Sequence, residues 1–193
     1  PNIIYYQKNK HIVSSVLLGK HYLSNIAGAI ALCTLYELTI TEILEAISKF
    51  SGVKRRMEYI GTYKGVKFYD DYGHHPTEIK ATISALKNNT VGKLFVIFQP
   101  HRFTRTRDNF EELQESLEDA DYAVVTDVYS AGEEPIPGIN SKNLKGKNIK
   151  YIKSLRSVPI YIKENIESGD NVLTLGAGDI TLLGPQILKY LND

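Results

Sequence analysis

The sequence has a single cysteine, no long hydrophobic run and no excess of charge of one sign. Because one cysteine, Cys33, cannot form an internal disulfide, a disulfide-stapled secreted scaffold and a cysteine metal site are both excluded. The apolar runs Ile12–Gly19 and Ile26–Leu35 are shorter than the ~20 residues that cross a bilayer, so we expect no transmembrane helix. These absences favour a reducing, cytoplasmic location.

The charges are nearly balanced, with 23 Lys and Arg against 22 Asp and Glu. This balance gives no strong attraction to a nucleic-acid backbone or an anionic membrane, so neither is an expected partner. The amino end, Pro1–Tyr6, has neither an initiator Met nor the pattern of a signal peptide. At about 100 to 200 residues per domain, the 193 residues would hold one complete domain and part of another, as if cut from a longer protein.

Residues 19–50 carry apolar side chains at helical spacing, which predicts two consecutive helices. Thr39 and Glu42 have the arrangement of a capping box, so the second helix should begin near Ile40 and end at Ser51-Gly52. This part of the chain is expected to be mainly helical.

After Arg56 the pattern changes to short β-rich runs alternating with amphipathic helices. The alternation predicts a Rossmann-like α/β domain, whose mostly parallel sheet carries helices on both faces. We therefore divide the chain into residues 1–55 and 56–193. The expected strands are Val66–Tyr69, Leu94–Phe98, Tyr122–Thr126, Ile149–Ile152 and Val172–Leu175. The expected helical faces are Ile79/Ile83/Leu86, Phe110/Leu113/Leu117, Val158/Ile162/Ile166 and Leu183/Ile187/Leu191.

Unusual residues follow four of these strands. In open α/β sheets a ligand sits beyond the carboxyl ends of the strands, so the four segments should form one site. Residues 127–147 are rich in Gly and Pro and predict a long, functional loop with at most one short helical turn. The four strand-end segments are Asp70–His75, Gln99–Arg102, Asp127–Tyr129 and Gly176–Asp179.

The first segment places two carboxylates and two imidazoles within six residues, before Pro76 at a predicted first helical position. One interpretation is a functional cluster that includes Asp71 and His74. The other is that these side chains only cap the helix and satisfy loop amides, and the residues alone leave both open. Adjacent histidines point to different sides of a chain, so we expect no metal site here.

The second segment continues to Arg107 as an expected loop before the next helix, and it holds one histidine, His101, and three arginines. Guanidinium groups match carboxylate and phosphate geometry, so Arg102 and Arg105 are candidates for holding an anionic substrate group. A solvated basic face is the alternative, and it suits Arg107 best because Asp108 follows it directly.

The segment Gly176–Asp179 has only the first two glycines of a dinucleotide fingerprint, with Thr181 in place of the third. A nicotinamide or flavin cofactor is therefore not expected. The turn could approach a ligand closely and Asp179 could meet an ammonium group, although a tight turn made only for packing is equally consistent. Nucleophilic catalysis is not expected, because no Gly-x-Ser-x-Gly elbow is present and Cys33 lies in an apolar helical run.

Taken together, these motifs resemble the Mur ligase family, and within it the ligases that join L-alanine to UDP-N-acetylmuramate. The resemblance covers the whole chain, including a helix start at Gly19–Asn25 and an interdomain arginine segment at Gly52–Glu58. The loops that carry it, in family order, are Asp70–Glu78, Phe98–Thr106, Asp127–Glu133 and Gly176–Ile180.

The resemblance implies a three-domain enzyme, in which residues 1–55 end the central ATP-binding domain and residues 56–193 form the carboxyl-terminal domain. It implies ATP and magnesium as cofactors, with UDP-N-acetylmuramate and L-alanine as substrates joined through an acyl phosphate. The sequence has no Gly-x-x-Gly-Lys-[Ser/Thr] phosphate loop. We therefore expect the magnesium ligands mainly in a preceding part of the protein, and the chain alone to be inactive.

For the nucleotide, the resemblance implies that Arg56 and Asp71 are catalytic and contact ATP. It also implies that Asn25 contacts the adenine region and that His74 lies near the base and ribose. The chain departs from the family pattern at Tyr22, where an asparagine is usual.

For the amino acid, the resemblance implies that Tyr72, His101, Arg102 and Arg105 surround L-alanine, with the arginines on its carboxylate and Asp179 near the same end. A recycling ligase that adds a ready-made peptide is the nearest rival, although Tyr72-Gly73 favours the alanine ligase. A non-catalytic module that binds a nucleotide or an amino acid is the alternative of a different class.

Overall fold

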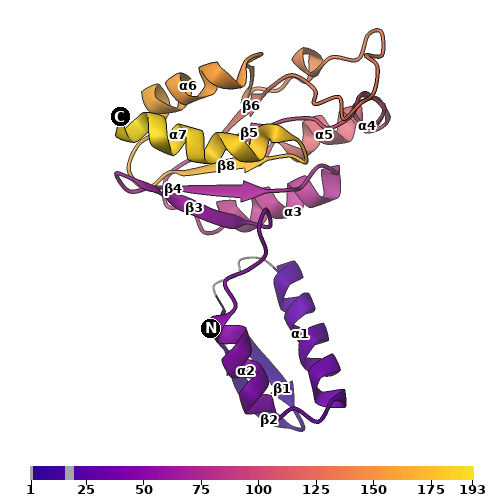
Figure 1. The fold of residues 1–193 in the computed structure, drawn as a ribbon, viewed down its shortest axis with the longest axis vertical. Helices are drawn as coiled ribbons and strands as arrows, with labels where there is room; N and C mark the ends of the chain where they lie inside the picture. The colour runs from indigo at the N-terminus through magenta and orange to yellow at the C-terminus, as the bar shows by residue number, and fades with distance from the viewer. Residues whose placement is uncertain (1, 16–19) are drawn as a thin grey trace. The chain divides into compact units, whose positions relative to one another are not determined.

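The computed structural model describes residues 2–15 and 20–193 (Figure 1). The chain forms two compact units, Pro1–Val53 and Lys54–Asp193. Each unit has its own hydrophobic core, and each is described by itself.

The first unit contains a β-hairpin that the sequence pattern did not reveal. Strand β1 (Asn2–Tyr6) pairs antiparallel with β2 (Asn9–Val13). The two turn residues, Gln7 and Lys8, have φ angles of 48° and 68°. Two-residue hairpin turns require such positive φ values, and they usually signal themselves by Asn or Gly. Here Gln and Lys occupy those positions, so the usual signal is missing.

The two predicted helices of this unit are present as α1 (Lys20–Leu35) and α2 (Ile40–Lys49). The capping box is confirmed: the Glu42 amide donates to the Thr39 hydroxyl, and the Glu42 carboxylate accepts from the Thr39 amide. Residues 16–19, which include the start of the predicted Gly19 helix motif, lie outside the described residues. The small core of this unit consists of Val13, Ile26, Ile30 and Ile43.

The second unit is built on a six-stranded sheet with the order β3-β4-β8-β5-β6-β7 (Figure 1). All neighbouring strands are parallel except β3, which runs antiparallel to β4 at one edge. The five predicted strands are confirmed, whereas β3 was not predicted because a glycine and several half-exposed side chains interrupt its pattern. The strands are β3 (Glu58–Tyr63), β4 (Val66–Asp71), β5 (Leu94–Phe98), β6 (Tyr122–Val125), β7 (Ile149–Tyr151) and β8 (Asn171–Leu175).

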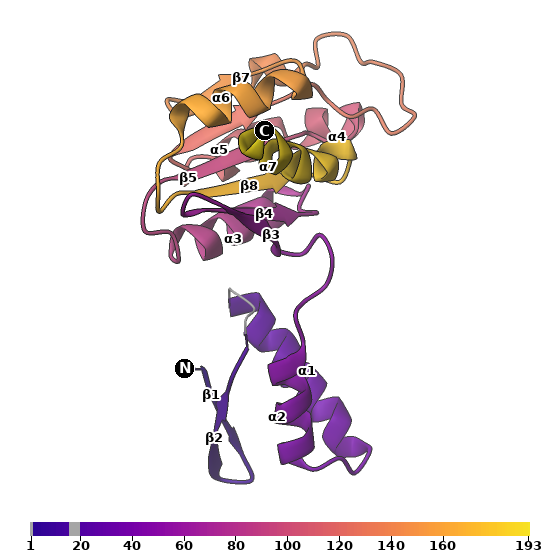
Figure 2. The same cartoon turned by 60° about the vertical axis from the view of Figure 1, so that its left-hand side comes forward.

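Helices cover both faces of this sheet, as predicted (Figure 2). Helices α6 (Val158–Asn165) and α7 (Leu183–Asn192) pack together over Phe95 and Ile97 of β5. Successive strand residues point to opposite faces, so the buried alternate positions of β5 serve the other layer, where α3 (Pro76–Lys87) packs against α5 (Phe110–Ser116). Burial on both faces explains why β5 is apolar throughout.

Both edges of the sheet are short or irregular. Strand β7 has only three residues, and β3 has a register shift between Tyr59 and Gly61. The predicted long loop after β6 is confirmed, and its only helical turn is η1 (Ser141–Asn143). The remaining short helices are α4 (Phe103–Asp108), η2 (Leu155–Ser157) and η3 (Asp179–Leu182).

Among the described residues, no helix has the length and apolar character needed to span a membrane.

Candidate functional site

The loops after β4, β8, β5 and β6 meet at the carboxyl edge of the sheet, because these four strands are parallel neighbours. The Gly176 amide donates to the Asp71 carbonyl at 3.0 Å, which joins the first loop to the last. The Arg102 amide donates to the Tyr129 carbonyl at 2.8 Å, which joins the other two. The structure therefore brings together the four segments that the sequence placed at one site.

Asp71 fixes the backbone at the start of this site. The residue is 4% exposed, and its carboxylate accepts hydrogen bonds from the amides of Met57 and Gly73, at 2.8 and 2.7 Å. Burial raises the pKa of Asp71 above its usual range, although the two amides and the nearby Arg56 charge act in the opposite direction. Both carboxylate oxygens are thus engaged within the protein.

Asp70 is fully buried beside it and was not among the predicted site residues. Its carboxylate accepts hydrogen bonds from the hydroxyls of Thr174 and Thr181, at 2.6 and 2.7 Å. One of its oxygens lies 3.6 Å from Nε of Arg55. A buried carboxylate needs such partners, because removal of a charge from water is costly.

Arg55 contacts three parts of the site. Its Nη2 donates to the carbonyls of Gly176 and Gly178, at 2.7 and 3.2 Å. Its guanidinium also lies 4.8 Å from the centre of the Tyr72 ring, within the range of a cation–π contact. The resemblance pointed to the neighbouring Arg56, so sequence reasoning missed Arg55.

Arg56 lies at the more exposed side, with 45% of its side chain accessible. Its Nη1 is 3.7 Å from Oε1 of Glu78, and its guanidinium is 5.6 Å from the Tyr72 ring centre. Glu78 also accepts a hydrogen bond from the amide of His74 at 3.2 Å. Although partial burial acts to raise it, the pKa of Glu78 is lowered by the His74 amide and by nearby positive charge.

The two adjacent histidines have different environments. His75 is exposed and caps α3, where its ring accepts the Thr77 amide. His74 is half-buried, with its ring 5.2 Å from that of Tyr72 and 6.1 Å from that of His101. The capping interpretation therefore applies to His75, whereas His74 faces the cluster. Pro76 occupies the start of α3, as predicted.

His101 stacks on Tyr129, with 5.5 Å between ring centres and an interplanar angle of 18°. Its Nδ1 lies 3.0 Å from Nη1 of Arg105. Because a guanidinium can only donate, Nδ1 must accept, and the neutral ring then carries its proton on Nε2. Burial and the Arg105 charge lower the pKa of His101, which favours this neutral form.

Arg105 lies in a helix that begins earlier than predicted, and Arg102 directly precedes this helix. The sequence suggested a loop up to Arg107, but α4 begins at Phe103. Glu133 caps this helix from the long loop, since its carboxylate accepts from the Thr104 amide and hydroxyl at 3.0 and 2.6 Å. Arg107 is exposed and pairs with Asp108, in agreement with the solvated interpretation of that arginine.

The glycine turn after β8 lies against the loop after β5. Gln99 donates from Nε2 to Asp179 at 2.7 Å, and its Oε1 accepts the Ile180 amide at 3.2 Å. A Cβ at Gly178 would lie 2.5 Å from Gln99 Oε1 and 2.6 Å from Cγ of Tyr129. Glycine is therefore required here for close packing of the turn against the ring that supports His101.

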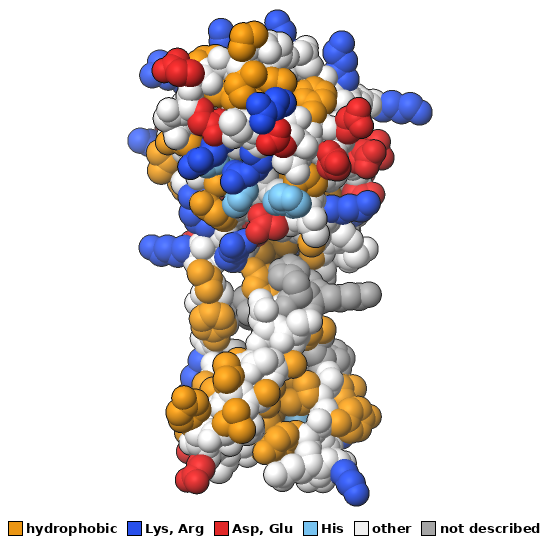
Figure 3. Space-filling model, turned by 90° about the vertical axis from the view of Figure 1, so that its right-hand side faces the viewer, with side chains coloured by type: hydrophobic (Ala, Val, Ile, Leu, Met, Phe, Trp, Pro, Cys, Tyr) orange, Lys and Arg blue, Asp and Glu red, His pale blue; other side chains and the backbone are white. Residues whose placement is uncertain are grey.

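A cleft of about 320 Å³ opens beside this turn. Gln99, Tyr129 and the exposed Asp179 line it, together with Asp127 and Lys153. Figure 3 shows that Lys, Arg and His side chains gather on this unit around an acidic group. The cleft itself offers Asp127, Lys153 and Asp179, so its charges suit a small ligand that carries both positive and negative charge.

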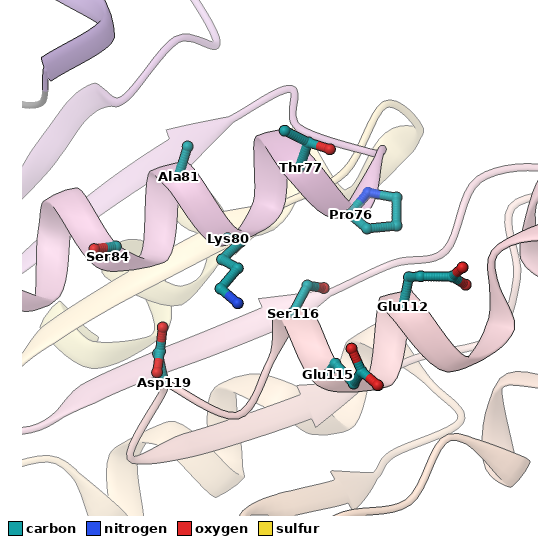
Figure 4. A pocket seen from close by; sticks show the side chains of 9 residues that line it. All are labelled: Pro76, Thr77, Lys80, Ala81, Ser84, Glu112, Glu115, Ser116 and Asp119. Carbon is teal, nitrogen blue, oxygen red and sulfur yellow. The ribbon is translucent and has the colours of Figure 1, made fainter.

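A second groove, of about 490 Å³, lies between α3 and α5 (Figure 4). Lys80 points from α3 toward Ser116 and Asp119 of the facing segment. None of the predicted site residues lines this groove. The groove and the candidate site therefore share none of the predicted site residues.

Asn25, the remaining predicted residue, is exposed on α1 in the first unit. Its contact with adenine stays a prediction. Among the described residues, no group of three or more His, Cys, Asp and Glu side chains is arranged to hold a metal ion.

Comparison with known proteins matches residues 55–178 to the model described as "Mur ligase, glutamate ligase domain". A UDP-N-acetylmuramate–L-alanine ligase of Desulforamulus reducens is 37% identical over 91% of this chain and 39% of its own length. The chain thus spans about two fifths of the length of this curated relative.

Solved structures agree on the fold. A UDP-N-acetylmuramate-alanine ligase from Thermotoga maritima superposes with a TM-score of 0.80 and 24% identity, covering 97% of this chain and 42% of that one. The MurF ligase of Thermotoga maritima, in complex with ADP, superposes with a TM-score of 0.75 and 21% identity, covering all of this chain and 46% of that one. With the family model matching more than half of its residues, the chain belongs to the Mur ligase family.

Proposed function

We propose that this chain is the carboxyl-terminal part of an ATP-dependent ligase that joins L-alanine to UDP-N-acetylmuramate, a step of peptidoglycan synthesis. The observation that carries the proposal is that the loops bearing His101, Arg102, Arg105 and Asp179 meet at one edge of the sheet. The name of the Desulforamulus reducens relative supports the choice of substrates. Residues 1–55 would then complete the central ATP-binding domain, and the reaction would take place in the cytoplasm.

The proposed amino-acid site consists of groups of complementary charge. Arg102 and Arg105 would hold the carboxylate of L-alanine, because guanidinium groups bind carboxylates through two parallel hydrogen bonds. Asp179 would face the ammonium group, and Tyr72 would close the side near β4. The neutral His101 orients Arg105 through the bond at Nδ1.

The proposed nucleotide contacts lie on the other side of Tyr72. Arg56 is half-exposed and carries a permanent charge, which suits a phosphate group. His74 lies between Tyr72 and His101, where a ring can contact a base or a ribose. Asp71 holds residues 57 and 73 in place beside Arg56 and remains a candidate for nucleotide contact. The ADP in the related MurF structure is consistent with a nucleotide in this family.

The carboxylates of Asp70 and Asp71 do not fit a magnesium ion. Both oxygens of Asp71 accept backbone amides, and those of Asp70 accept threonine hydroxyls within a fully buried position. A magnesium ion needs accessible oxygen ligands and usually keeps several waters. We therefore propose that its ligands lie mainly in a part of the protein outside this chain.

The test is phosphate release by the full-length protein supplied with UDP-N-acetylmuramate, ATP, magnesium and L-alanine. Release that depends on L-alanine would support the proposal, and this chain alone should release none. Arg105→Met should raise KM for L-alanine by roughly tenfold or more, since a charged hydrogen bond contributes about 1.5–3 kcal/mol. Arg156→Met, which changes an exposed arginine, is the matched control.

The same assay separates the rival functions. Phosphate release with a tripeptide, and none with L-alanine, would assign the protein to the recycling ligases. Saturable binding of a nucleotide or amino acid without any phosphate release would instead favour a binding module.

A further inference from the structure

Arg55 contacts the loops after β4 and β8 of the candidate site, and the family resemblance assigned it no role. Its side chain is only 27% exposed, which is low for an arginine. We propose that Arg55 is a positioning residue: it holds the Gly176–Gly178 turn and Tyr72 in the arrangement that receives the amino acid. The identity of the amino acid in this inference rests on the proposed function, whereas the contacts of Arg55 do not depend on it.

The contacts of Arg55 use the full shape of a guanidinium group. Nη2 donates to two carbonyls of one turn, those of Gly176 and Gly178. The planar face lies over Tyr72, and Nε is buried without a hydrogen-bond partner, 3.6 Å from the carboxylate of Asp70. A lysine could supply the charge but not the fork or the planar face. The site thus selects arginine by shape as well as by charge.

The backbone of Arg55 is fixed as tightly as its side chain. Its φ angle is 58°, in the left-handed region that non-glycine residues rarely occupy. Its amide donates to the Glu58 carboxylate at 2.7 Å, and its carbonyl accepts the Tyr72 amide at 2.7 Å. Hydrogen bonds on both sides therefore hold a strained residue in place, an arrangement that often accompanies functional sites.

The turn that Arg55 holds determines the position of two proposed substrate groups. Asp179 directly follows Gly178 and is bonded to Gln99. Gly178 itself packs against Tyr129, which stacks on His101. A shift of the turn would therefore move Asp179 and loosen the support of His101 together. Arg56 lies beside Glu78, whereas Arg55 bonds to the turn, so we expect substitutions of the two adjacent arginines to have different effects.

The kinetic test compares Arg55→Met and Arg55→Lys in the full-length protein. Arg55→Met should raise KM for L-alanine by about tenfold, because two charged hydrogen bonds to the turn are lost, while KM for ATP changes much less. Arg55→Lys should recover only part of this loss. Arg156→Met, at an exposed arginine of the same unit, should leave both constants unchanged.

A second measurement is independent of activity. Hydrogen exchange of the same variants should show faster exchange at the Gly176, Ile180 and Tyr72 amides, with the amides of β5 unchanged. If amide exchange became faster by the same factor throughout the unit, or if KM for L-alanine and KM for ATP rose equally, Arg55 would only stabilise the fold. Either result would overturn the inference. If the wild-type protein releases no phosphate, the proposed function fails, and local exchange still decides whether Arg55 holds the turn.

Discussion

Nδ1 of His101 accepts a hydrogen bond from the guanidinium of Arg105, with 3.0 Å between the two nitrogens. A ring nitrogen can accept only when it carries no proton, so the pair exists only with neutral histidine. Burial and the positive charge of Arg105 both hold the pKa of His101 below its usual value. The arginine is thereby kept in a fixed orientation by a group that does not compete for an incoming anion.

This pair predicts a pH dependence. The pKa of His101 is lower in the folded than in the unfolded chain, where it should be near the usual value of about 6.5. Its contribution to stability is therefore complete above about pH 6.5 and is lost as the pH falls through the folded-state pKa. NMR titration of the His101 ring should give a midpoint below that of an unfolded histidine.

Arg105→Met should raise this midpoint toward the usual value, because it removes both the donor and the charge. Arg107→Met is the control, since Arg107 is exposed and pairs with Asp108. A wild-type midpoint at or above the usual histidine value would show that the pair does not form.

Gly178→Ala should destabilise the second unit by about 1–3 kcal/mol, as expected when an added methyl group displaces packed atoms. The new Cβ would overlap Gln99 and Tyr129. Gly184→Ala is the matched control within the same unit, because its Cβ would meet nothing closer than 3.6 Å. Urea unfolding monitored by circular dichroism gives the free energy of unfolding of both variants. Equal losses of stability would argue against close packing at Gly178.

Asp70→Asn should destabilise the second unit by about 3 kcal/mol, the usual cost of leaving one member of a buried charge pair unpaired. The amide keeps the size of the carboxylate but removes the charge that faces Arg55. Asp108→Asn, at an exposed pair, should change stability by no more than about 0.5 kcal/mol. If Asp70→Asn lowered the free energy of unfolding only slightly in urea, the charge of Asp70 would not be needed to balance that of Arg55.

The chain by itself should self-associate weakly. Leu32, Leu35 and Tyr36 of the first unit are 61–80% exposed, and apolar surface of this extent favours association. Light scattering should show an apparent mass that rises with concentration, and Leu32→Gln with Leu35→Gln should reduce the rise. Val91→Gln, which alters a 95% exposed side chain of the second unit, should not. A monodisperse monomer at high concentration would contradict the prediction.

Much of the second unit could be predicted from the sequence, because its strands are buried on both faces. Leu94–Phe98 is apolar at every position and its boundaries were predicted without error. Strand β3 was not predicted because it lies at an edge, where Gly61 and exposed side chains replace the apolar run. The β1–β2 hairpin was not predicted because Gln7 and Lys8 adopt positive φ angles that are unusual for their residue types.

The meeting of the loops could also be predicted, since parallel strands place their carboxyl ends along one edge. The partners within the site could not. Arg55 reaches a turn 121 residues later, and Glu133 caps a helix by bonding to Thr104, 29 residues before it. Such contacts depend on the folded arrangement of distant segments, so neither local pattern nor spacing announces them. The proposed roles of the site residues remain predictions.

The two outer strands of the second unit have a further consequence for how copies of the chain can meet. An unpaired strand edge invites addition of another strand, and this leads to fibrous aggregates. Here one edge offers only three residues and the other is bent by a register shift. Neither presents a regular ladder of free amides and carbonyls to a second sheet. The folded domain should therefore resist edge-to-edge aggregation at high protein concentration.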